Sequence, residues 1–440
     1  MKKSQVIVFL LAAALLQACC GKVVEQKCAF DCGIAKELGK IVKEAGIPHM
    51  QLNYKGPDGQ FGFGIQNLYF ADTAARAIVA VNGDDSTAIF QGASLSKVIF
   101  SYIVMRMYQD GEIDLDKPLC NYTDIDRFTN KEYASLITAR IVLSHRTGLS
   151  NWAYGPSAPE WPVSPIEFKF RPDSCYGYSG EGIAFLQRAV ESIKGKSIDE
   201  IAKEMVFDPL GMSHTAYCWL PCYDSLAVPG FNGNGENRGP GRHPRSNTAY
   251  TIRTNAKEYG KFLDELFWGE SLSAQTRELF FAPGKERAIR YAGEPRQCDS
   301  TMYWGMSIGI EMNPKYGKVL WHWGDNGNFK ALFMYLPQQQ KRFVYFTNSA
   351  HGHDIINKVT ALLFAAEEPF AMERWINQYR TLTLDPVRQV LCSPRQRVLA
   401  RLVLCSSRRR APALFAAAPT CNLELSGNKE VSFWGMINAR

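Results

Sequence analysis

Residues 90–105, FQGASLSKVIFSYIVM, constrain the fold of this chain more than any other stretch. A Gly-Ala-Ser lead-in followed by a long apolar run predicts a helix that begins near Ser94. Residues three apart share one face of a helix, so the amine of Lys97 can lie beside the hydroxyl of Ser94. An amine that accepts the hydroxyl proton would activate Ser94 as a nucleophile, and the N–H groups at the helix start would face an oxyanion. The pattern indicates acyl-transfer chemistry.

Serine and lysine at this spacing are a weak signal by themselves. Ser426 and Lys429 have the same spacing in a segment where we expect no chemistry. A helix cap followed by a solvated lysine is the simpler interpretation of a single match. The interpretation of Ser94 therefore depends on the sequence that follows it.

The net charge of the chain is +7, and its location decides what it means. Residues 385–440 contain nine Lys or Arg and three acidic residues, which gives +6 and leaves +1 for the rest of the chain. A body that is not basic gives no support for a nucleic-acid partner. We expect residues 385–440 to form a basic, weakly ordered tail.

The N-terminus has the form of a secretory signal. Two lysines precede an apolar segment over residues 6–16, which is too short to span a membrane. The segment ends Leu-Gln-Ala-Cys, which resembles the lipobox of bacterial lipoproteins and implies cleavage before Cys19 and acylation of its thiol. The alternative is plain secretion with cleavage after Ala18. We expect a signal over residues 1–18, a tether over 19–35, and a lipid anchor that holds the protein in the periplasm.

Twelve cysteines fit an oxidising compartment. Cys28 with Cys32, or Cys218 with Cys222, could close small loops, and the spacing leaves the connectivity open. Neither C-x-x-x-C has a neighbouring histidine pair, so we expect no metal site.

The segments after the Ser94 helix carry a resemblance to a known family. FQGASLSK, then a helix, then DGEIDLDKPL resembles the serine β-lactamase and penicillin-binding-protein superfamily, above all the branch of class C β-lactamases, D,D-peptidases and esterases. Later segments follow the family pattern in order: IVLSHRTGL at 141–149, VFDPLGMSHT at 206–215 and AYTIRTNAKEYGKFL at 249–263. The resemblance covers about residues 50–365.

The second chemical motif of this family is matched by FRPDSCYGYSGEG at residues 170–182. The resemblance implies that Tyr178 is the catalytic tyrosine. The ammonium of Lys97 could lower the phenol pKa and let Tyr178 pass a proton between Ser94 and the leaving group. This chain has Gly180 where the family often has asparagine, which leaves open the contact to a substrate amide that the asparagine would supply.

The third motif lies in a predicted β-meander. Its strands are expected at residues 302–312, 318–323, 329–336 and 342–346. WHWGDNG at 321–327 resembles the family's K-T-G or H-x-G motif. The resemblance implies that Gly324 lets the substrate lie close to the strand and that the Asp325 N–H is an oxyanion donor beside that of the serine. His322 would take the third-motif position, although a histidine between tryptophans could instead be a packed structural residue.

His322 bears on the substrate class. The family's lysine helps to bind a substrate carboxylate, whereas an unperturbed histidine is mostly neutral at pH 7. Together with Gly180, this favours an ester, a D-amino-acid peptide or another periplasmic acyl compound over a β-lactam. We expect His322 to be a neutral hydrogen-bonding or pocket-shaping group rather than an imidazolium that binds a carboxylate.

Residues 229–246, PGFNGNGENRGPGRHPRS, are rich in Gly, Pro and Asn and have no periodicity. They predict a long loop, which is either the rim of the site or a mobile surface excursion. The sequence favours neither.

The resemblance implies an α/β fold that is β-lactamase/transpeptidase-like, with an antiparallel sheet flanked by helices. One serine-hydrolase domain would cover residues 36–384, with an inserted, mainly helical lobe at about 116–248. The expected function is hydrolysis of an amide or ester through a Ser94 acyl-enzyme, without a cofactor; D,D-carboxypeptidase or β-lactamase activity proper is the alternative. A non-catalytic sensor or scaffold is the alternative from another class. We expect a monomer and a small-molecule or peptidoglycan-like substrate.

We predict that Cys19→Ala releases the protein from membranes, because acyl chains on that thiol would hold it there. Cys20, rather than aspartate, follows Cys19, so the unmodified sequence should fractionate with the outer membrane rather than the inner. Fractionation of cells that express each version measures both points. Equally firm membrane association of the variant would contradict the lipoprotein interpretation.

Overall fold

The structure is a computed structural model that describes residues 33–68, 76–81, 87–289 and 297–383. The expected signal, the lipidation site Cys19 and the 385–440 tail lie outside the described residues. Residues 33–35, which the sequence assigned to the tether, instead begin a helix that runs through residues 33–44. Across the described ranges, no helix combines the length and the apolarity needed to cross a membrane. The described residues up to Thr381 form one compact unit.

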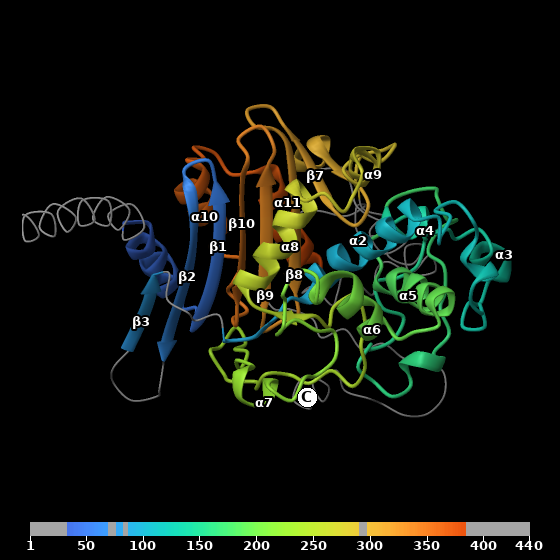
Figure 1. The fold of residues 1–440 in the computed structure, drawn as a ribbon, viewed down its shortest axis with the longest axis horizontal. Coiled ribbons are helices and arrows are strands. Elements are labelled where there is room, and N and C mark those ends of the chain that lie inside the picture. Colours follow the sequence, from blue (N-terminus) through green and yellow to red (C-terminus); the bar gives the residue numbers. More distant parts are fainter. Residues whose placement is uncertain (1–32, 69–75, 82–86, 290–296, 384–440) are drawn as a thin grey trace, which may run out of the picture. The chain divides into compact units, whose positions relative to one another are not determined.

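An antiparallel sheet of eight strands forms the centre of this unit (Figure 1). Its strands are β1 (His49–Gly56), β2 (Gly59–Leu68), β3 (Arg76–Val81), β6 (Met302–Trp304), β7 (Gly309–Asn313), β8 (Gly317–Asp325), β9 (Lys330–Leu336) and β10 (Lys341–Thr347). They lie in the order β3-β2-β1-β10-β9-β8-β7-β6. Because β1 pairs with β10, strands from the two ends of the domain lie side by side, with Leu52 opposite Tyr345. The expected antiparallel sheet is confirmed.

Alternating side chains of the sheet enter two separate cores. In β9, Phe333 packs into the core that contains α2, and Met334 packs into the core that contains the helix of residues 33–44. This alternation follows from the two-residue period of a strand. Helices α2 (Ser96–Gln109), α8 (Ala256–Trp268) and α9 (Ala274–Phe280) belong to the first core, and α10 (Ile356–Phe364) and α11 (Ala371–Thr383) belong to the second. The sheet therefore has helices on both faces, as expected.

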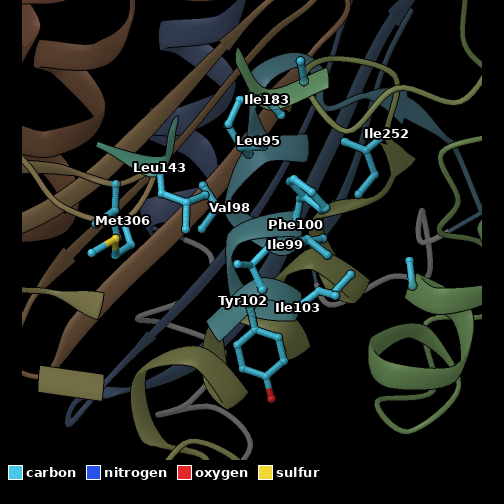
Figure 2. Packing of buried hydrophobic residues seen from close by; sticks show 14 of the residues in the cluster. Leu95, Val98, Ile99, Phe100, Tyr102, Ile103, Leu143, Ile183, Ile252 and Met306 are labelled. Atoms are coloured by element: carbon cyan, nitrogen blue, oxygen red, sulfur yellow. The ribbon is translucent and has the colours of Figure 1, made fainter. Parts of the chain in front are cut away.

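Helix α2 is buried around its whole circumference. Val98, Ile99 and Phe100 leave the helix in successive directions, and all three are fully buried. Figure 2 shows Leu143 and Met306 on one side of the helix and Ile252 on another. A helix that is apolar on every side belongs in a core. Burying each large apolar side chain contributes about 1.5–3 kcal/mol, so this packing fixes the helix firmly.

The inserted segment at residues 116–248 is less helical than expected. Its α-helices are α3 (Lys131–Ala134), α4 (Ala139–Leu143), α5 (Gly180–Lys194), α6 (Ile198–Ala202) and α7 (Tyr223–Leu226), and α6 continues as a π-helix over Lys203–Phe207. Only α5 among these α-helices is longer than five residues. The sequences at residues 155–165 and 229–246 are rich in Gly and Pro and interrupt the helical periodicity. Much of the segment is therefore loop. Figure 1 shows α3 to α6 gathered beside the sheet.

The strand expected at residues 302–312 is divided into β6 and β7. Residues 305–308 leave the sheet because their backbone bonds to helices instead. The Ser101 hydroxyl on α2 donates to the Met306 carbonyl at 2.8 Å, and the Ser307 N–H donates to the Leu143 carbonyl at 2.7 Å. These long-range bonds override the local strand pattern.

Candidate active site

Ser94 lies in a short 3₁₀ turn, Ala93–Leu95, that leads into α2. The turn follows strand β4 (Phe90–Gln91), which is held by pairing with β5 (Arg253–Thr254). Ala93 has φ 47°, in the left-handed region that residues with a side chain rarely adopt. This turn leaves Ser94 half-buried while Ala93 and Leu95 on either side are buried. A strained residue directly before a nucleophile candidate is the kind of outlier that points to function.

Lys97 is buried beside Ser94, as the helical spacing predicts. Its Nζ lies 3.0 Å from Ser94 Oγ and donates to the Ala249 carbonyl at 2.6 Å, while the residue is only 1% exposed. Burial lowers the pKa of Lys97 from 10.5 to about 7, because the ammonium loses its hydration. About half of such amines are neutral at pH 7 and able to accept the proton of the Ser94 hydroxyl.

Tyr178 lies against Lys97, although the two residues are far apart in the sequence. The Lys97 ammonium lies over the face of the Tyr178 ring, 4.9 Å from its centroid, which is a cation–π contact. The ring also packs against Trp323, with centroids 5.2 Å apart. The structure therefore brings the predicted tyrosine to the Ser94–Lys97 pair, through its ring face.

His145 fixes the backbone next to Tyr178. Its Nδ1 accepts a hydrogen bond from the Ser179 N–H at 3.2 Å, and its ring centroid lies 4.2 Å from that of Tyr178. Burial, with the nearby charge of Lys97, holds the pKa of His145 well below its usual range, so the ring is neutral. The sequence segment that contains His145 was recognised, but this positioning contact was not.

No three His, Cys, Asp or Glu side chains in the described ranges group closely enough to hold a metal ion.

Ser94 and Lys97 open into a cavity of about 350 Å³. Its aromatic walls are Trp152, Tyr250 and Phe329, and its carboxamides are Gln91, Asn151, Asn326 and Asn328. Arg238, Gly239, Gly241 and His243 close one side. Most of these residues were not identified from the sequence, because they lie on loops whose approach to Ser94 no periodicity encodes.

The loop of residues 229–246 is the rim of this cavity. The side chain of Gln91 donates to the Pro240 carbonyl at 2.8 Å, and so does the buried guanidinium of Arg253, also at 2.8 Å. Both donors come from the β4–β5 pair that leads to Ser94. The rim interpretation is correct, since four residues of the loop line the cavity. The loop is also hydrogen-bonded at Pro240 to the β4–β5 pair.

His322 is a neutral, packed residue rather than a cationic binding group. It is fully buried, is absent from the cavity lining, and its Nδ1 donates to the Trp323 carbonyl at 2.7 Å. That bond leaves Nε2 as an unprotonated acceptor, which has no hydrogen-bond partner among the described residues. Burial and the charge of Lys97 lower the pKa of His322 to about 3. The neutral form that the sequence favoured is the form present, and the buried ring lies beside Tyr178, with centroids 6.3 Å apart.

Gly324 has a different role from the one expected. A Cβ at this position would lie 2.4 Å from the Gly92 carbonyl oxygen and 3.2 Å from the Ala93 Cβ. The missing side chain lets β8 pack directly on the turn that carries Ser94, so the space belongs to the chain's own backbone and not to a substrate. Asp325 follows Gly324 and lines the cavity, where its carboxylate pairs with Lys330. This packing brings the backbone of Asp325 to the cavity that Ser94 faces.

Gly180 is the first residue of α5 and does not line the cavity. A Cβ there would lie 2.5 Å from the Trp152 ring and 2.9 Å from the Asn151 carbonyl oxygen. The neighbouring loop thus occupies the space of a side chain at position 180. Neither Asn151 nor Trp152 was singled out from the sequence, and no local signal marks them.

This arrangement defines a class of acyl-transfer proteins, in which a serine and a buried lysine share the start of a helix packed on an antiparallel sheet. The chain belongs to the Beta-lactamase family, whose model matches residues 65–366.

Individual relatives are distant. Penicillin-binding protein 4 from Amycolatopsis lactamdurans is 28% identical over 142 residues, which are 30% of this chain and 36% of that protein. The D-alanyl-D-alanine-carboxypeptidase/endopeptidase AmpH from Escherichia coli is 26% identical over 141 residues, which are 29% of this chain and 37% of that protein. The chain thus spans little more than a third of the length of these relatives. A β-lactamase/D-alanine carboxypeptidase from Pseudomonas syringae has the same fold, with a TM-score of 0.59 and 13% identity over 78% of this chain and 100% of that one.

We predict that Gly324→Ala disables Ser94 without unfolding the protein. The new methyl group would push β8 away from the Gly92 carbonyl, and small misplacements of a catalytic group cost about a hundredfold in rate. The rate of Ser94 labelling by a fluorophosphonate probe measures this. Gly62→Ala is the matched control, because nothing lies within 4 Å of a Cβ at that strand position. Equal labelling of both variants would show that the contact has no role.

Proposed function

We propose that the protein is a serine hydrolase that cleaves an amide or ester through an acyl-enzyme on Ser94. The observation that carries this proposal is the 3.0 Å separation of Lys97 Nζ and Ser94 Oγ beside an open cavity. The lowered pKa of Lys97, about 7, supports it because the neutral amine is the form that can act as a base.

The proposed steps use the site residues that the sequence identified. Ser94 Oγ attacks the substrate carbonyl carbon while its proton passes to Lys97 Nζ. The N–H groups of Ser94 and Asp325 hold the oxyanion. The leaving group departs with the proton from Lys97, which Tyr178 helps to relay, and the acyl group stays on Ser94. Water then attacks the acyl carbon, its proton returns through Lys97, and Ser94 is released with its hydroxyl restored.

The cavity and the relatives support a proposal for the substrate class. A buried, neutral His322 gives a substrate carboxylate no counter-ion at the third motif. Aromatic and carboxamide walls suit a peptide-like or ester acyl group. The names of the two relatives concern penicillin binding and D-alanyl-D-alanine peptides. We therefore propose a D-amino-acid peptide, or a small ester that mimics one, as substrate for a lipid-anchored periplasmic enzyme, with D,D-carboxypeptidase or β-lactamase activity as the alternative.

We predict that intact-protein mass spectrometry finds one acyl group on Ser94 after mixing with p-nitrophenyl acetate, and that the group is then lost by hydrolysis. Ser94→Ala should gain none there, since removing such a nucleophile costs on the order of a millionfold. Lys97→Ala should slow acylation severely, and the double variant should be no slower than Ser94→Ala. Continued turnover by Ser94→Ala would overturn the proposal. A permanent adduct, from the ester or from a β-lactam, would instead indicate a sensor or a penicillin-binding protein.

We also predict that kcat/KM rises with pH through about 7 and then levels off, because only neutral Lys97 can take the proton and its pKa is about 7. His322 and His243 have pKa values lowered to about 3 and about 4, so neither should add a second limb between pH 5 and pH 9. Steady-state rates on p-nitrophenyl acetate measure the profile, after subtraction of the uncatalysed rate. A kcat/KM that falls as the pH rises through this range would exclude Lys97 as the base.

A further inference from the structure

A second cavity, of about 180 Å³, lies beside helix α5. Its apolar walls include Phe128, Trp161 and Phe185, and its lining has no residue in common with that of the cavity that Ser94 faces. An engineered protein cavity of about 150 Å³ is known to hold a benzene ring. This second cavity is therefore large enough for one aromatic ring.

The charges that line the second cavity do not cancel. Arg127 forms an ion pair with the buried carboxylate of Glu181 at 3.3 Å, and Arg188 forms one with Asp124 at 3.0 Å. Arg245 also lines the cavity, and it forms no ion pair with any described residue. One positive charge thus remains without a counter-ion, and it favours an anionic ligand.

Arg245 has one edge of its guanidinium group free. Its Nη1 donates hydrogen bonds to the carbonyl oxygens of Pro156 at 3.1 Å and Ala158 at 3.2 Å, which use both hydrogens of that nitrogen. Nε and Nη2 donate no hydrogen bond within the described parts of the chain. Their N–H groups lie parallel along one edge, which is the geometry that binds both oxygens of a carboxylate. The guanidinium carbon lies 5.7 Å from the centre of the Trp161 ring, so this edge is next to an aromatic wall.

Asn247 supplies a further donor to the same cavity. The residue is only 2% exposed, and its Oδ1 accepts a hydrogen bond from the Ala249 N–H at 2.9 Å. Nδ2 is at the other end of the planar amide, and it donates to no group that the structure describes. A buried donor without a partner calls for an explanation, and a ligand that accepts its hydrogen bond provides one.

The two cavities lie on opposite sides of shared chain segments. Arg245 and Asn247 line the second cavity, and the residues they hold, Pro156 and Ala249, line the catalytic one. The Ala249 carbonyl accepts the hydrogen bond from Lys97 Nζ at 2.6 Å. Hydrogen bonds in a chain polarise one another, so an anion that accepts from Asn247 makes the Ala249 carbonyl a better acceptor. That change favours the ammonium form of Lys97, which cannot act as a base.

We propose that the second cavity is an effector site for a small aromatic carboxylate, and that a ligand bound there slows the reaction at Ser94. The carboxylate binds the free edge of Arg245 and the Nδ2 group of Asn247, and its ring lies against Trp161. The binding site is independent of the proposed acyl-enzyme function, whereas its effect on the rate rests on that function.

The test follows binding of 4-fluorobenzoate by fluorine NMR. Arg245→Gln should raise the Kd about tenfold or more, because it removes a charge-assisted pair of hydrogen bonds. Arg238→Gln is the matched control, since it removes the same charge from the same loop but at the catalytic cavity, and its Kd should be unchanged. The uncharged 4-fluorobenzamide should bind about tenfold more weakly than the carboxylate.

Ala184→Leu is a second variant, which narrows the second cavity without changing its charge and should also weaken binding. Thermal melting establishes that each variant is folded. The proposal is overturned if the unmodified protein does not bind the probe, or if Arg245→Gln and Ala184→Leu both bind it as tightly. Loss of binding in Arg238→Gln alone would place the probe in the catalytic cavity, which also overturns the proposal.

The effect on the reaction is measured as kcat/KM for p-nitrophenyl acetate at pH 7. Saturating 4-fluorobenzoate should lower it about fivefold, which is at the lower end of allosteric couplings, and should not lower it in Arg245→Gln. An unchanged kcat/KM in the unmodified protein overturns the effector role, provided that Ser94→Ala abolishes turnover. Turnover by Ser94→Ala would instead show that the proposed acyl-enzyme function is wrong.

Discussion

The burial of one amine is the constraint on which the rest of the structure depends. Burying an ammonium away from water costs free energy and favours the neutral amine. Such burial serves a function where the neutral amine acts as a base. Lys97 meets this condition because α2 is enclosed by core on every side and the Ala249 carbonyl gives the amine an acceptor. The core around α2 and the ring of Tyr178 surround this position apart from its opening to the cavity. A looser core would return the pKa of Lys97 toward 10.5 and leave Ser94 without a base.

The position of Ser94 also requires that two segments far apart in the sequence, the serine turn and β8, pack together with no side chain between them. Gly92 directly precedes the serine turn and Gly324 lies on β8, and the contact between them brings the end of β8 against that turn. Ala93 keeps its unusual backbone angle in this confined space. Rigidity at the nucleophile thus comes from backbone packed on backbone, which leaves few ways for the turn to relax.

Local patterns predicted the parts of this protein that are themselves local. The pairing of Ser94 with Lys97 follows from helical spacing, and most of β7 to β10 follows from alternation. The failures at the site involve distant partners. Gly324 was assigned to a substrate because the sequence does not show that Gly92 lies against it. For His322 the sequence left a pocket role and a packed role open, because a strand pattern does not say which of its faces is covered. Asn151, which lines the cavity, was missed for the same reason, since its hydrogen bond to Gly180 joins residues 29 positions apart.

The hydrogen bonds that hold the 229–246 loop at Pro240 have a consequence for which changes of sequence the loop can accept. The side chains of Gln91 and Arg253 hold the loop by hydrogen bonds to the backbone carbonyl of Pro240. A backbone carbonyl is present whatever residue occupies that position. The residues between Phe231 and Gly239 are not part of those hydrogen bonds, and glycine, asparagine and charge dominate there. Insertions and substitutions in this stretch can reshape one wall of the cavity without disturbing Ser94 or Lys97. The fold thus holds the loop through its backbone and leaves the side chains of this stretch, such as Arg238 at the cavity, outside those bonds.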